Sequence, residues 1–75
     1  MPEIHKHVID AAIHDVNSRI DPLGRLHYFG RDTETGNARI VLYTDGDAYG
    51  RLAVVGTPRE CLLFLRGMIH ALELT

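Results

Sequence analysis

The chain has 75 residues, enough for one domain, and its shares of 45% hydrophobic and 24% charged residues are typical of a globular protein. A net charge of -2 argues against a strongly basic nucleic-acid binder, although it does not exclude a local basic patch. One cysteine excludes an internal disulfide, and the longest apolar stretch, Cys61 to Leu65, is too short to span a membrane.

These bounds carry expectations about assembly and location. We expect residues 1–75 to form a single domain that buries only about 60% of its unfolded surface and is therefore marginal alone. Small domains often gain stability by oligomerisation, so we expect a homodimer. The N-terminal residues lack the apolar segment of a signal peptide, and a single Cys61 suits a reducing compartment, so we expect a cytoplasmic protein without membrane contact.

The hydrophobic periodicity predicts two helices around three strands. Apolar residues recur at helical spacing over residues 3–20, and Asp21-Pro22 ends that helix. Strands follow over residues 26–31, 38–44 and 49–55, separated by a polar hairpin loop and a Gly- and Asp-rich turn. Thr57 and Glu60 form a capping-box pattern that begins a second helix ending at Leu74, and Gly67 within it suggests a close contact.

The order α-β-β-β-α predicts a two-layer α+β sandwich. Consecutive strands joined by short loops form a three-stranded antiparallel meander, and both helices pack on one of its faces. Strand alternation then assigns the side chains to two faces. The residues expected to face the helices are Leu26, Tyr28, Ile40, Leu42, Leu52 and Val54.

The opposite face of the sheet is the predicted binding surface. Its aromatic and aliphatic side chains are edged by arginines, whereas a sheet covered on one side normally shows polar residues on the other. Three interpretations stay open: a contact between two copies, a surface for a protein partner, and cross-strand pairs that shield each other. The predicted binding residues are Phe29, Arg31, Arg39, Val41, Tyr43, Tyr49 and Arg51.

The element order is similar to that of the double-stranded RNA-binding domain, which packs two helices on one side of a three-stranded sheet. That family places a basic cluster at the start of its last helix, where this chain has Thr57 to Leu62 (TPRECL) with one Arg and one Glu. No RNA-binding residue is therefore carried over. A nucleic-acid binder that stacks bases on Phe29, Tyr43 and Tyr49 is the alternative to the protein-interaction module.

No motif predicts an enzyme, a cofactor or a metal centre. The polar side of the first helix places Glu3, His7, Asp10 and His14 close together, which leaves divalent-metal binding open. Asp45 and Asp47 precede a glycine as in a calcium loop, but two ligand positions of that loop fail. We expect a non-enzymatic interaction module, and by class-level analogy this includes the phage and mobile-element proteins that block a host protein.

Overall fold

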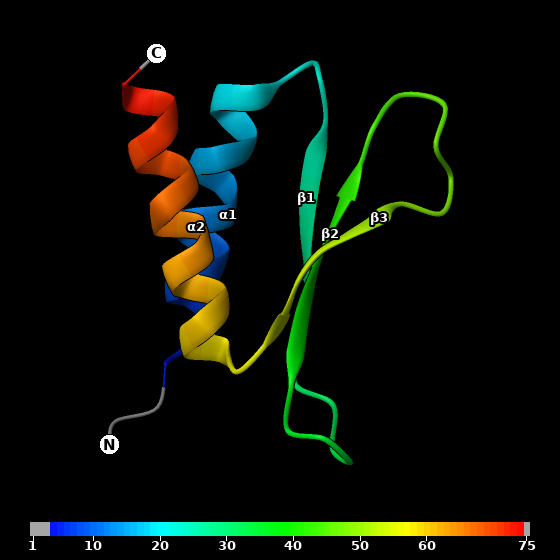
Figure 1. Ribbon diagram of the computed structural model, residues 1–75, viewed down its shortest axis with the longest axis vertical. Coiled ribbons are helices and arrows are strands. Elements are labelled where there is room, and N and C mark those ends of the chain that lie inside the picture. The colour runs from blue at the N-terminus through cyan, green and yellow to red at the C-terminus, as the bar shows by residue number, and fades with distance from the viewer. Residues whose placement is uncertain (1–3, 75) are drawn as a thin grey trace.

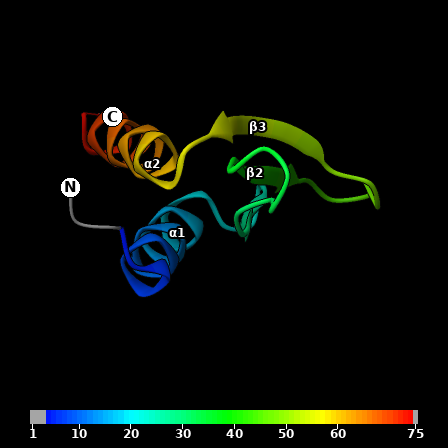
Figure 2. The same ribbon diagram turned by 90° about the horizontal axis from the view of Figure 1, so that it is seen from below.

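Two helices cover one face of a three-stranded antiparallel sheet in the computed structural model, which describes residues 4–74 (Figure 1). The elements are α1 (Lys6–Ile20), β1 (Arg25–Phe29), β2 (Ala38–Tyr43), β3 (Arg51–Gly56) and α2 (Pro58–Glu73). The strands lie in the order β1-β2-β3, and the second view shows α1 and α2 together on one side of them (Figure 2). The predicted α-β-β-β-α sandwich with a meander sheet is confirmed.

The two helices begin in different ways. α2 has the predicted capping box, in which the Thr57 hydroxyl accepts from the Glu60 amide at 3.2 Å and the Glu60 carboxylate accepts from the Thr57 amide at 3.1 Å. α1 begins at Lys6 rather than at residue 3, and its preceding residue, His5, makes no side-chain cap. Glu3 lies outside the described residues. Arg19 stands in the last turn of α1, as the helix dipole favours.

An irregularity in β3 corrects the predicted faces of the sheet. Ile40 pairs with Val54, but the next residue, Val41, pairs with Leu52, so Ala53 is an extra residue in β3. Because one extra residue reverses the alternation, Leu52 lies opposite Val41 on the face away from the helices. The prediction that Leu52 faces the helices is wrong for this reason.

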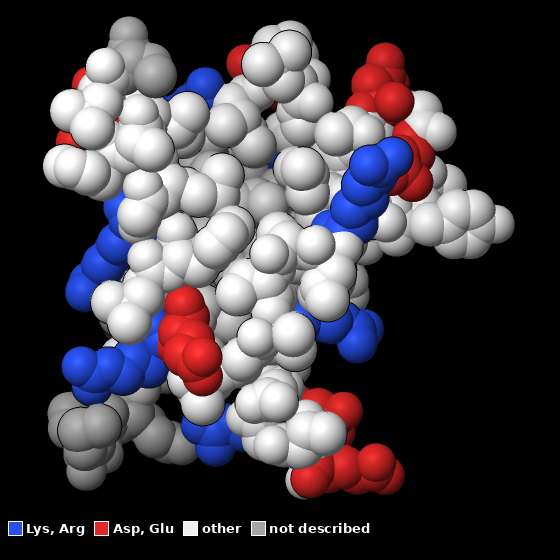
Figure 3. Space-filling model, viewed as in Figure 1, with Lys and Arg blue, Asp and Glu red and all other residues white. Residues whose placement is uncertain are grey.

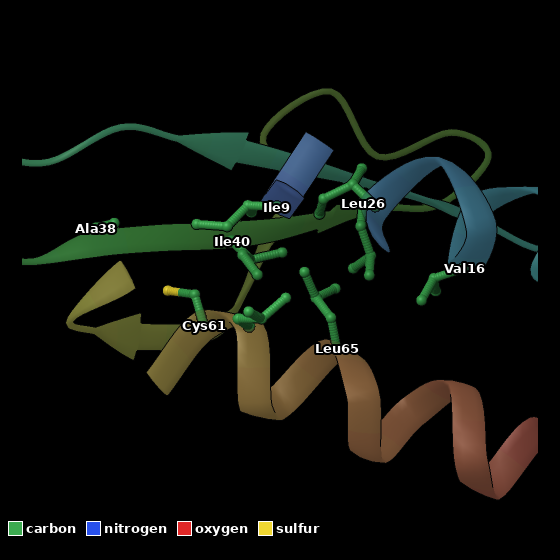
Figure 4. Close-up of a cluster of buried hydrophobic side chains, with 9 residues drawn as sticks. Ile9, Val16, Leu26, Ala38, Ile40, Cys61 and Leu65 are labelled. Atoms are coloured by element: carbon green, nitrogen blue, oxygen red, sulfur yellow. The ribbon is translucent and has the colours of Figure 1, made fainter. Parts of the chain in front are cut away.

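The core lies between the helices and the inner face of the sheet. α1 contributes Ile9 and Val16, which are fully buried, and α2 contributes Cys61 and Leu65 (Figure 4). Ile40 is the fully buried centre of the sheet in this cluster. Tyr28, Leu42 and Val54 pack against the core as predicted. Within residues 4–74, neither helix combines the length and the apolar character needed to cross a membrane.

The outer edge of β1 is held by α1. The Asn17 side chain accepts from the Leu26 amide at 2.7 Å and donates to the Leu26 carbonyl at 3.0 Å, as a neighbouring strand would do. Those two backbone groups therefore point away from β2. β3 has β2 as its one strand neighbour among the described residues.

Candidate functional site

The face of the sheet opposite the helices brings together side chains from all three strands. We call it the outer face and define it by the register. Its members are Arg25, His27 and Phe29 of β1, Arg39, Val41 and Tyr43 of β2, and Leu52 and Val55 of β3. Four of the seven predicted binding residues, Phe29, Arg39, Val41 and Tyr43, lie on it.

Phe29 is the centre of one half of the outer face. The Arg39 guanidinium lies 4.9 Å from the centre of its ring, and the His27 ring meets it edge-on with the centroids 4.6 Å apart. Arg39 is the cross-strand partner of Phe29, so the contact follows directly from the register. The ring is half-buried, and cross-strand shielding accounts for this half of the face.

A glycine covers part of the other half. Gly50 precedes β3 with a φ of +75°, and a Cβ placed on it would lie 2.5 Å from Val41 Cγ1 and 2.8 Å from Tyr43 Cε1. The loop backbone therefore rests on these two side chains, which are half-buried as a result. Only a glycine allows this approach, because the positive φ disfavours any side chain and there is no room for a Cβ beside Val41 and Tyr43.

Three predicted binding residues are placed away from the outer face. Tyr49 lies in the loop before β3 and is 94% exposed, because the Asp47 carboxylate accepts from the Tyr49 and Gly50 amides and holds both outside the strand. Arg51 pairs with Leu42, which puts it on the side of the sheet that carries the helices. Arg31 lies beyond the end of β1, in a depression shared with Lys6 and Pro58.

Two aliphatic side chains on β3 were missing from the predicted site. Leu52 is 59% exposed and Val55 is 55% exposed, and both lie on the outer face. Alternation places Val55 there, although the predicted site omitted it. Leu52 depends on the extra residue Ala53, which no sequence pattern announces.

A shallow depression joins the outer face to the loop between β1 and β2. Asp32 is its one carboxylate and Arg39 its one guanidinium. Asp32 Oδ1 accepts from the Glu34 amide at 2.8 Å, so this carboxylate shapes the loop. The depression is lined by Phe29, Gly30, Asp32, Thr35, Asn37, Ala38, Arg39 and Val55.

Asp10 and Asp47, two of the carboxylates considered as metal ligands, make local contacts. Asp10 pairs with Lys6 at 3.0 Å on the exposed side of α1. No group of three or more His, Cys, Asp or Glu side chains within residues 4–74 could hold a metal ion, and Glu3 of the suggested set lies outside that range. Asp47 is part of the loop before β3, as its bonds to Tyr49 and Gly50 show.

Two titratable groups of the core have shifted pKa values. Burial raises the pKa of the Cys61 thiol, which keeps it protonated and disfavours nucleophilic chemistry. Burial also raises the pKa of Tyr28, with a smaller contribution from Cys61. Both shifts come from packing against the core.

Comparison of the chain with protein-family models, curated proteins and solved structures gives no match. The interpretation of the outer face therefore depends on its own geometry.

Proposed function

We propose that the protein is a small, non-enzymatic, homodimeric interaction module of the cytoplasm, and that its outer face binds a protein partner. One observation carries the proposal. The extra residue in β3 turns Leu52 onto the outer face, where Leu52 and Val55 are each more than half exposed beside Val41 and Tyr43. No helix of the described chain covers this face (Figure 2).

The chemistry of the face favours a protein over a nucleic acid. Its exposed centre is aliphatic, and burying such side chains is favourable in any protein contact. Arg39 stacks on Phe29, so one cation and one aromatic ring of the face already engage each other. The net charge of -2 provides no general attraction to phosphates.

The test compares two leucines that are each more than half exposed. The protein is immobilised and incubated with extract from its source cells, and the retained proteins are identified by mass spectrometry. We expect Leu52→Glu to abolish retention of a specific partner. Leu23→Glu should retain it, because Leu23 is 80% exposed in the turn between α1 and β1, away from the outer face and from α2.

Two results would contradict the proposal. Equal retention by both variants would show that the outer face is not the binding surface. Bound material that is lost after nuclease treatment, with affinity falling steeply as salt rises, would identify a nucleic-acid binder instead.

A further inference from the structure

The β3 side of the molecule offers a second surface, separate from the outer face. β3 and α2 lie together on one side of the molecule, and β1 and α1 lie on the other (Figure 2). On the β1 side, the Asn17 side chain is hydrogen-bonded to the outward amide and carbonyl of Leu26. On the β3 side, the strand ends the sheet with no strand beside it among residues 4–74.

The register determines which backbone groups of β3 point outward. The Leu26 backbone bonds to Asn17, so Leu26 and its partner Leu42 form a pair without mutual hydrogen bonds. Because these directions alternate along β2, the amide and carbonyl of Ile40 point toward β3 and those of Arg39 point toward β1. Val55, the partner of Arg39, therefore directs its amide and carbonyl away from β2, toward the open edge.

The protection of this open edge against pairing lies at its start. Natural edge strands carry bulges, Lys, Pro or inward charges, and in β3 these are the extra residue Ala53 and Arg51, which lies on the side of the helices. The extra residue at Ala53 interrupts only the first half of the strand and leaves Val54 to Gly56 regular. The surface between α2 and β3 is broad and largely uncharged, with charged side chains toward its margins (Figure 3).

α2 carries a matching pattern beside this edge. Phe64, Gly67 and Ala71 are spaced by three and four residues, so they share one stripe of the helix, on the side away from Leu62. A Cβ added to Gly67 would meet nothing within 4 Å, so the close contact predicted for Gly67 is absent within residues 4–74. An exposed helix-interior glycine costs about 1 kcal/mol relative to alanine, which packing inside one copy does not explain.

We propose that a second copy of this chain occupies the β3 side, with the two β3 strands paired antiparallel and the two α2 helices packed against each other. This inference rests on the homodimeric part of the proposed function and assigns the surface that forms the dimer. It places both outer faces on one six-stranded sheet and leaves them free for partners.

The geometry favours a second copy over another protein because the surface is complementary to itself. An antiparallel strand pair has two-fold symmetry, which also makes the neighbouring helices antiparallel. On antiparallel helices, Phe64 of one copy can lie against the notch at Gly67 of the other. Strand pairing centred on Val55 joins the regular halves of both strands, Val54 to Gly56, and lets the outward amides and carbonyls of the two Val55 residues bond to each other.

The test combines oligomeric state with amide exchange. The wild-type protein should be a dimer by light scattering after size exclusion, and the Val55 amide should exchange slowly by NMR. Gly67→Lys should be a folded monomer with fast Val55 exchange, since a lysine has room in one copy but not between two helices. Arg66→Glu, on the same helix but about 100° from Gly67 and about 160° from Phe64, should remain a dimer.

The outcomes separate this inference from the proposed function. A dimer that persists in Gly67→Lys but is lost in Leu52→Glu would overturn the β3 interface while keeping the homodimer. A wild-type protein that is monomeric at about 100 µM would overturn both the interface and the homodimer. Partner retention through the outer face is measured independently in either case.

Discussion

The β1 side and the β3 side of the sheet differ in what lies beside the strand. On the β1 side, Asn17 bonds to both backbone groups of Leu26, and Phe29 is shielded by Arg39 and His27. On the β3 side, the strand is irregular, its edge has no neighbouring strand within the described chain, and Leu52 and Val55 are exposed. The β1 side is completed by its own chain, whereas the β3 side presents the surfaces that a partner could cover.

The largest effect should come from removing the glycine that rests on the outer face of the β3 side. Gly50→Ala places a Cβ 2.5 Å from Val41 Cγ1 at a φ of +75°, so strain and overpacking together should cost about 3 kcal/mol of unfolding free energy. Urea denaturation followed by circular dichroism measures this loss.

A matched glycine separates the two causes. Gly46 has a φ of +84°, and a Cβ added there would meet nothing within 4 Å. Gly46→Ala should therefore cost about 1 kcal/mol, from the backbone conformation alone. Equal losses at Gly46 and Gly50 would mean that the contact of the loop with Val41 and Tyr43 adds nothing to stability.

A smaller effect is expected from opening the β1 edge. Asn17→Ala leaves the Leu26 amide and carbonyl without their partner, at a cost of about 2 kcal/mol that is partly offset by the better helix propensity of alanine. Ser18→Ala, at an exposed neighbouring position, should cost less than about 0.5 kcal/mol.

The oligomeric state of Asn17→Ala, measured by light scattering, tests which edge of the sheet forms the dimer. Asn17→Ala should leave the oligomeric state unchanged, because the proposed dimer uses the β3 edge. A monomeric Asn17→Ala protein that remains folded would show that the β1 edge forms the dimer.

Element order and most of the inner face could be predicted from the sequence, because they depend on local patterns. The apolar spacing of α1, the capping box of α2 and the alternation of β2 each reflect residues close together in the chain. The face of Leu52 could not be predicted, because the extra residue Ala53 depends on how β3 meets β2. One such residue is enough to exchange Leu52 and Arg51 between the faces.

The candidate site was predicted where it lies in regular strands and missed where it depends on contacts between elements. Phe29, Arg39, Val41 and Tyr43 lie in regular strands, and alternation brings them together. Tyr49 was predicted to begin the third strand, but Asp47 holds its amide in the loop. The role of Asn17 had no signal in the sequence, since its two bonds join residues of different elements.

The smallest effect should appear at the junction of β3 and α2, and only in acid. The Glu60 carboxylate accepts from the amide and the hydroxyl of Thr57 at 3.1 and 3.0 Å, and these bonds lower its pKa below the ordinary value. A lowered folded-state pKa means that the contribution to stability is complete above the unfolded pKa and is lost as pH falls through the folded pKa.

The loss of stability in acid that comes from Glu60 should therefore disappear when its carboxylate is replaced. Glu60→Gln keeps an acceptor for the Thr57 amide, so its melting temperature near pH 7 should stay close to that of the wild type. Below about pH 4.5 the wild type should lose stability more steeply than the variant. Glu34→Gln, which changes a carboxylate outside any helix cap, should follow the wild-type curve. Parallel acid curves for Glu60→Gln and the wild type would show that the cap at the end of β3 does not depend on the charge of Glu60.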